Sequence, residues 1–334
     1  MTAALLAKLL AIAATVALGW LAARQRWLGP LAGDADAGRV DAAGVLGHAA
    51  FYLFVPALLF RTMAQQDLSA LPVRTLAAYF VPATAYALAV YAWQRLRAPA
   101  AGATAGAAAP ATRTVTATYG NAVQLGIPMA TALFGAGGLA LHLALVSVHG
   151  LVLLTLLTVL VERDLARGQG GSRWQTLAST ARNAVLHPVV LPILAGLGWN
   201  LLGLRLPGVL DEALALLGSA VVPVCLVLIG ASLASYGLRG SLRAALALGL
   251  LKLLVLPALV LAVAGWGFGL QGPPLAVLVM MAALPVGNNA LIFAQRYGVL
   301  QAEATLAIVA STLAFGATAA LWLGVLGALG VPGR

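Results

Sequence analysis

Residues 280–298 read MMAALPVGNNALIFAQRYG, a strongly apolar stretch that contains several features unfavourable to a continuous helix. Pro285 and Gly287 are followed directly by two amides, Asn288 and Asn289. Proline lacks a backbone N–H group and clashes with the preceding turn, so it interrupts an α-helix. Lipid cannot satisfy the backbone groups that such a break frees, and the break must be buried in protein or line a wet cavity. The stretch therefore predicts a membrane helix that is broken at a functional site.

The composition of the whole chain indicates an integral membrane protein. The 334 residues are 62% hydrophobic and 8% charged, and the mean hydropathy is +0.99. A soluble core of this size cannot cover so much apolar surface. Apolar runs of about 20 residues recur, which favours helices over a β-barrel. The net charge of +10 comes without a dense basic cluster, so no nucleic-acid partner is expected.

Ten apolar runs are predicted to cross the bilayer. They cover residues 3–23, 43–63, 73–94, 114–134, 139–161, 185–203, 213–236, 242–266, 273–296 and 303–328. The loops on one side hold 13 Lys and Arg residues, and the loops on the other side, with the C-terminal tail, hold 4. By the positive-inside rule, both termini are expected on the non-cytoplasmic side.

The polar segment 162–184 is expected to be a cytoplasmic linker between two five-helix repeats, residues 1–161 and 185–334. Because five is odd, the second repeat would enter the membrane upside down, which is the inverted-repeat plan of secondary transporters. Prolines mark corresponding helices of the two halves. Pro56 pairs with Pro223 in the second and seventh spans, and Pro128 pairs with Pro285 in the fourth and ninth.

The two broken helices are predicted to cross near the midplane and to bind a ligand. Asn121 and Gln124 accompany Pro128, as Asn288 and Asn289 accompany Pro285. Half-helices beginning near Met129 and Val286 would direct N–H groups and positive dipole ends at the crossing, which favours an anion. The competing interpretation is a pair of proline kinks in packed helices. The matching positions, each with neighbouring amides, favour a binding site.

Lys252 lies about 15 Å into the eighth span, close to mid-bilayer. An uncompensated charge there costs at least ~2.5 kcal/mol, so it should face a cavity or a partner. No Asp or Glu lies deep in a span to pair with it. Lys252 is therefore a candidate substrate-binding residue, and the alternative is a structural lysine that binds the carbonyls of a broken helix. The histidines have no metal-ligand spacing, and no catalytic constellation is visible, so no metal, cofactor or enzymatic activity is expected.

The motifs of the broken helices resemble a known family. Gly120-Asn121 through Gly126-Ile127-Pro128 resembles the fourth-helix pattern of the auxin efflux carrier family, and Ala283-Leu284-Pro285 through Asn288-Asn289 resembles its ninth-helix pattern. Pro56-Ala57-Leu58-Leu59-Phe60 and the segment after Pro223 match helices two and seven. One departure is His187-Pro188, where the family more often has Asn-Pro.

The resemblance implies an all-α, ten-helix secondary transporter for small organic anions such as carboxylates or auxin-like acids. It implies a scaffold within residues 3–63 and 185–236, often a homodimer interface, and a moving transport domain within 73–161 and 242–328. The long central loop of many plant members is absent, which suggests a bacterial inner-membrane protein. The alternative is a sodium-coupled bile-acid-type or arsenite-type ten-helix carrier, which would favour acidic or additional polar groups near the crossing. A channel or a purely structural membrane protein would not need two matched breaks.

Overall fold

The computed structural model describes residues 3–29, 42–66, 72–97, 106–123, 125–167, 178, 182–183, 185–188, 190–236 and 242–330. Across these ranges the chain is helical, and its extended structure is limited to one isolated β-bridge. The first half contains α1 (Ala3–Arg24), α2 (Ala42–Ala49), α3 (Val55–Ala64), α4 (Val73–Arg97), α5 (Ala109–Thr118), α6 (Gly126–His149) and α7 (Thr155–Arg167). The second half contains α9 (Val190–Leu201), α10 (Gly208–Ser219), α11 (Val221–Tyr236), α12 (Leu242–Leu250), α13 (Leu256–Ala262), α14 (Gly272–Ala283), α15 (Asn289–Tyr297) and α16 (Gln301–Ala328).

Short π-helical segments join several of these helices into longer ones. They are η1 (Ala50–Phe54), η3 (Gly150–Leu154), η4 (Leu251–Val255) and η5 (Val263–Gly267). Two of them end just before a proline, since η1 precedes Pro56 and η4 precedes Pro257. A proline cannot complete the usual bond to the residue four positions back, and a wider turn before it relieves the clash. The chain thus continues as a helix through both prolines.

Six stretches in the described part of the chain are long and apolar enough to cross a membrane. They are Gly44–Ala64, Val73–Arg97, Met129–Leu165, Gly208–Ala234, Leu242–Gly267 and Gln301–Ala328. The third stretch contains a sharp turn, because Gly135 adopts φ 62° and ψ −157°. That backbone conformation is accessible to glycine and strained for other residues. The turn lies where the sequence predicts the connection between the fourth and fifth spans.

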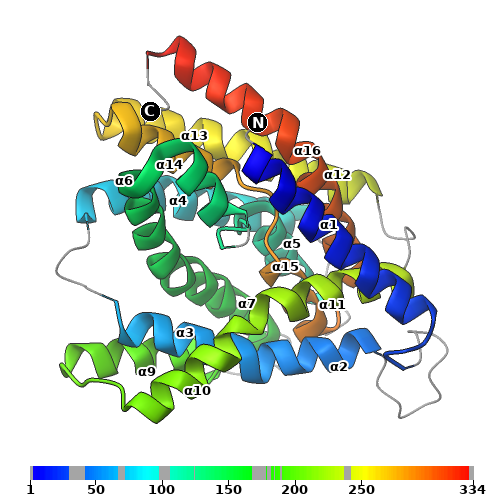
Figure 1. The fold of residues 1–334 in the computed structure, drawn as a ribbon. Helices are drawn as coiled ribbons and strands as arrows, with labels where there is room; N and C mark the ends of the chain where they lie inside the picture. Colours follow the sequence, from blue (N-terminus) through cyan, green and yellow to red (C-terminus); the bar gives the residue numbers. More distant parts are fainter. Residues whose placement is uncertain are drawn as a thin grey trace.

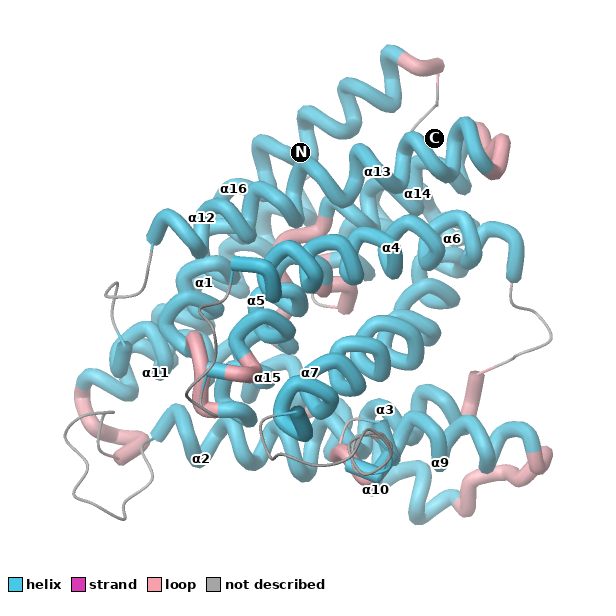
Figure 2. Tube along the Cα trace, turned by 180° about the vertical axis from the view of Figure 1, so that it is seen from behind, coloured by secondary structure: helices cyan, strands magenta, loops and turns pink. Residues whose placement is uncertain are grey.

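The helices form two groups (Figure 1). In one group α1 packs along α11, α3 packs against α9 and α10, and α2 contacts α11. In the other group α4 packs on α5 and α13, α14 contacts α6 and α13, and α12 contacts α16. Seen from behind, α3, α9 and α10 gather at the lower edge, while α4, α13 and α14 lie above (Figure 2). The short helices α5 and α15 lie between the two groups in both views.

The start of α5 differs from the prediction. The helix begins at Ala109, whereas the sequence places the beginning of the fourth span at 114. Pro110 occupies the first turn, where its missing N–H group costs nothing. Four buried threonines each donate a hydrogen bond to the carbonyl four residues back: Thr112, Thr114, Thr116 and Thr118. These bonds satisfy the threonine hydroxyls, so a weakly hydrophobic segment can form a buried helix. Because its hydropathy is low, the sequence pattern places the start of the helix too late.

Candidate functional site

The two broken helices meet in the interior and hydrogen-bond to each other. The first break separates α5 from α6, and the second separates α14 from α15. Gly120 and Val286 form an antiparallel bridge. The Asn121 N–H donates to the Pro285 carbonyl at 2.8 Å, and the Gly287 N–H donates to the Tyr119 carbonyl at 2.8 Å. Each break therefore satisfies backbone groups that the other has freed, which is what apolar surroundings require.

Local sequence explains why the chain can approach itself so closely. Leu284 has φ −57° and ψ 145°, the extended conformation favoured by a residue that precedes proline. At Gly287, an added Cβ would lie 2.7 Å from the carbonyl oxygen of Gly120. A side chain at this position would push the two breaks apart, so the close approach requires glycine.

Three side chains satisfy further backbone groups of the crossing. The Val286 N–H donates to the Ser311 hydroxyl at 3.0 Å. His142 Nε2 lies 2.8 Å from the Ala122 carbonyl and donates to it, because a carbonyl only accepts. Lys252 Nζ donates to the Ala282 and Leu284 carbonyls, the latter at 2.7 Å. The Lys252 side chain is 0% exposed, and it closes the C-terminal end of α14. This geometry favours the carbonyl-binding interpretation of Lys252.

One of the two half-helices that leave the crossing, α15, begins later than the sequence predicts. The helix α6 begins at Gly126 and carries Pro128 in its first turn, close to the expected start at Met129. The helix α15 begins at Asn289 rather than near Val286. The reason is that the Pro285–Gly287 segment is extended and forms the bridge, so the helix can begin only after it.

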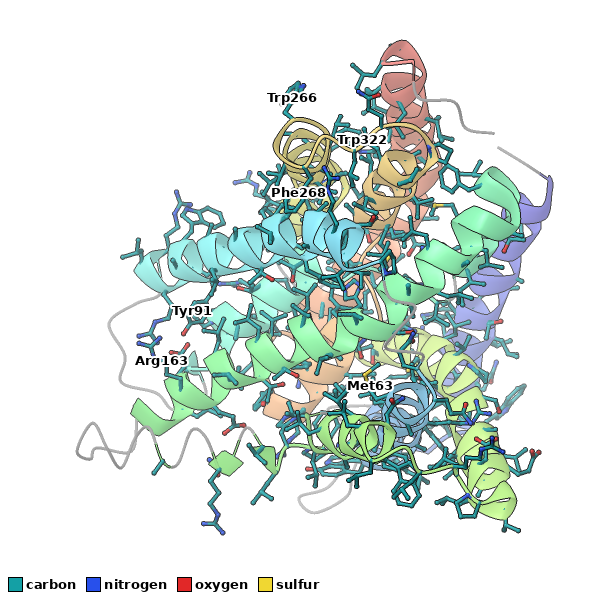
Figure 3. The ribbon with its side chains drawn as sticks, turned by 90° about the vertical axis from the view of Figure 1, so that its left-hand side faces the viewer. Met63, Tyr91, Arg163, Trp266, Phe268 and Trp322 are labelled. Atoms are coloured by element: carbon teal, nitrogen blue, oxygen red, sulfur yellow. The ribbon has the colours of Figure 1, made fainter. Side chains whose placement is uncertain are left out.

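A cavity of about 320 Å³ lies beside the crossing. Its walls are mainly apolar and come from α3, α6, α9, α11 and η3, with Met63 of α3 among them (labelled in Figure 3). Four of its polar residues belong to the crossing, and the others come from α3, α6 and α11: Tyr119, Asn121, Asn288 and Asn289 at the crossing, and Thr62, Ser147, His149 and Cys225 from the helices. No acidic residue appears in its lining as far as the structure describes it. The cavity joins an apolar chamber to a polar end, the usual character of a site for an amphipathic small molecule.

A second cavity of about 300 Å³ lies on the other side of the crossing, between α1, α11 and α16. Its lining is apolar except for a few polar residues, which include Asn121 and Asn288. These two amides thus line both cavities.

The structure brings together part of the predicted binding set. Asn121, Asn288 and Asn289 line the first cavity, whereas Pro285 and Lys252 shape the backbone behind it. Pro128 belongs to the first turn of α6, and Gln124 lies outside the described residues. Whether any of these residues binds a substrate stays a prediction.

The amides contact residues that the sequence argument did not assign to the site. The Asn289 amide lies close to the Tyr119 hydroxyl, and the Asn288 side chain lies close to the Cys225 thiol. The Asn288 Oδ1 atom is buried and has no partner among the described residues. Tyr119 directly precedes Gly120, and a search of the residues next to each break could have found it.

His187, where the family more often has asparagine, takes part in a hydrogen-bonded chain away from the cavity. His187 Nε2 lies 3.0 Å from the Tyr297 hydroxyl, and that hydroxyl donates to Glu162 Oε1 at 3.2 Å. Since Tyr297 has a single hydroxyl proton, it accepts from His187 and donates to Glu162. Within the described part of the chain, no group of three His, Cys, Asp or Glu residues could hold a metal ion.

Comparisons with known proteins indicate a membrane transporter. Residues 5–323 match a family model described as membrane transport protein. A similar relative is an uncharacterized transporter of Methanothermobacter thermautotrophicus, 26% identical over 254 residues that cover 75% of this chain and 78% of the relative. The family match runs from α1 to α16 and includes both breaks. The chain therefore belongs to the membrane transport protein family, the auxin efflux carrier family that its broken helices resemble.

Proposed function

We propose that this membrane transporter is a secondary carrier for small organic anions and works by alternating access. The observation that carries the proposal is the cavity beside the crossing, in which Asn121, Asn288 and Asn289 meet apolar walls from the other helix group. Amide N–H₂ groups donate hydrogen bonds to carboxylates. The N-terminal ends of α6 and α15 lie next to the cavity, and their positive dipole ends favour a negative charge.

The proposed topology has ten spans in two inverted five-helix repeats, with a scaffold of α1–α3 and α9–α11 and a transport domain of α4–α7 and α12–α16. Helices occupy each of the ten predicted ranges, and the beginning of α1 and the end of α16 lie toward the same side of the molecule. The scaffold helices would also form a homodimer interface.

The excess of Lys and Arg in one set of loops supports the proposed orientation, and exposed aromatic residues mark the membrane interfaces. At the predicted cytoplasmic end, Arg95 pairs with Asp164 at 2.7 Å, and Figure 3 shows Tyr91 and Arg163 nearby. At the other end Trp266 is 87% exposed and projects outward, as expected for an aromatic residue at a membrane interface (Figure 3). Both termini would then lie outside the cytoplasm, and the protein would reside in a bacterial inner membrane.

The character of the cavity favours an acid that has one negative group and an apolar body. The negative group would bind at the crossing, and the body would lie against residues such as Leu58, Met63 and Ile193. A sodium-coupled bile-acid-type or arsenite-type carrier would favour carboxylates near the crossing as ligands for the cation. The described linings of the two cavities contain no carboxylate.

Uptake into proteoliposomes tests the proposal. Aromatic and aliphatic monocarboxylates, dicarboxylates and their neutral amides are compared, with and without proton and sodium gradients. We expect uptake of monocarboxylates and a loss of about tenfold or more on Asn289→Ala, because a hydrogen bond to a charged group contributes ~1.5–3 kcal/mol. Equal uptake of acids and neutral amides by the wild type would refute the anion carrier. Unchanged acid uptake by folded Asn289→Ala would remove that amide from the site.

A further inference from the structure

His149 is a buried side chain whose hydrogen-bonding groups are unused. It is the last residue of α6, it is 1% exposed, and it belongs to the lining of the cavity beside the crossing. Neither Nδ1 nor Nε2 has a hydrogen-bond partner among the residues that the structure describes. Buried polar side-chain atoms are nearly always paired, so unpaired nitrogens on a residue that lines a cavity mark it as a candidate ligand contact.

The surroundings of His149 hold the ring in place without using its nitrogens. Its ring centroid lies 4.3 Å from that of Tyr119, 6.0 Å from that of Tyr79 and 6.2 Å from that of Phe80. Tilted and edge-on ring contacts of this kind restrict the imidazole by packing alone. The imidazole is thus held by packing, and its two nitrogens are covered but have no hydrogen-bond partner among the described residues.

Several polar groups surround His149, and two of them, the Tyr79 hydroxyl and His142 Nδ1, also lack a partner among the described residues. Lys252 and His142 are close enough to act on it electrostatically, but the first binds the carbonyls that end α14 and the second binds Ala122. Tyr119 links His149 to the crossing, since its ring packs on the imidazole and its hydroxyl contacts the Asn289 amide. His149 and Asn289 therefore flank the same tyrosine at the polar end of the cavity.

We infer that His149 is a specificity-determining residue of this carrier, and that its ring N–H donates a hydrogen bond to the carboxylate of the bound organic acid. A neutral imidazole carries one donor and one acceptor, and a carboxylate is an acceptor only, so the N–H group is the one it can use. A hydrogen bond to an ionised acceptor is stronger than one to a neutral acceptor, and His149 would thus favour an acid over its neutral ester. The inference rests on the proposed function of the cavity.

Two substitutions separate a ligand contact from packing. His149→Phe keeps an aromatic ring in the cluster and removes both nitrogens. His149→Gln loses the ring and keeps an N–H donor. If His149 is needed only for packing, His149→Phe should bind the acid better than His149→Gln. If His149 donates a hydrogen bond to the acid, His149→Gln should bind it better than His149→Phe. His48→Phe is the matched control, because His48 is exposed, bonds to its own helix at Gly44 and lies away from the cavity.

The assay measures binding of an organic acid and its methyl ester to purified protein in nanodiscs, by isothermal titration, with thermal unfolding as the check on folding. We expect His149→Phe to unfold like the wild type and to lose about tenfold or more in affinity for the acid, with a smaller loss for the ester. His149→Gln should keep part of the acid affinity, and His48→Phe should match the wild type.

Wild-type affinity for the acid in His149→Phe would overturn the role of His149 and leave the carrier proposal standing. Equal losses for acid and ester would also overturn it, because the residue would then only shape the cavity. A wild-type protein that binds none of the acids tested for uptake would overturn the proposed function, and this inference with it.

Discussion

Replacing Lys252 tests how the crossing is held together. Its amino group bonds the Ala282 and Leu284 carbonyls and is fully buried. Each bond from a charged donor contributes ~1.5–3 kcal/mol, so Lys252→Met removes about 3–6 kcal/mol of favourable interaction. The same substitution relieves the cost of an intramembrane charge, which is at least ~2.5 kcal/mol. The net expectation is a loss of up to about 3.5 kcal/mol in the free energy of unfolding.

The assay is thermal unfolding in nanodiscs together with binding of an organic acid to the folded fraction. Arg243→Gln is the control, because Arg243 is exposed near the start of the helix that leads to Lys252. We expect Lys252→Met to unfold at a temperature several degrees below that of the control. Its affinity for the organic acid should fall only through the distortion of the crossing. A Lys252→Gln protein with wild-type stability and about a tenfold loss of acid affinity would refute the structural argument. It would establish Lys252 as the group that attracts the anion.

Three further predictions concern the crossing, the topology and the energy coupling. Gly287→Ala should destabilise the fold by about 1–3 kcal/mol, because the new methyl would push apart the two breaks and weaken the backbone bonds that join them. The control is Gly324→Ala, whose new methyl meets no atom within 4 Å and should be neutral in the same unfolding assay. A cysteine added to the C-terminal tail in a Cys225→Ser background should react with an impermeant thiol reagent from the non-cytoplasmic side, and labelling only from the cytoplasm would reverse the topology. Glu162→Gln and Glu303→Gln should each retain gradient-driven uptake. The second should cost about 1.5–3 kcal/mol of stability, because the Glu303 carboxylate is buried and accepts two bonds from Arg113; loss of coupling with intact binding would place a carboxylate in the mechanism.

The sequence contains enough information to locate the breaks but not to predict how they join. Pro285 and the asparagines beside it identify a functional break, because few other features explain such residues in an apolar run. The two bonds that join the breaks, from Asn121 to Pro285 and from Gly287 to Tyr119, are long-range contacts, and a local sequence pattern cannot specify them. The late start of α15 has the same cause, since the bridge to the other half keeps the segment after Pro285 extended.

The cavity residues show a second limit of prediction from sequence. His149 lies 28 residues from Asn121 along the chain, and only the turn at Gly135 brings its helix back toward the crossing. Nothing in the local pattern distinguishes it from His142, which is bonded to backbone. Lys252 presents the opposite case. Its depth in an apolar helix identifies it at once, but its partners are carbonyls, which have no signature in a sequence.

The reciprocal bridge at the crossing has a consequence for kinetics. Because the Asn121–Pro285 and Gly287–Tyr119 bonds tie the two breaks directly, bending either one alone would sacrifice hydrogen bonds that lipid cannot replace. The crossing is then expected to travel as one rigid element during a transport cycle. The barrier to turnover would arise where the cavity walls that contain Val222 and Leu59 slide past it, so mutations in those walls should alter the speed of transport as well as the affinity for substrate.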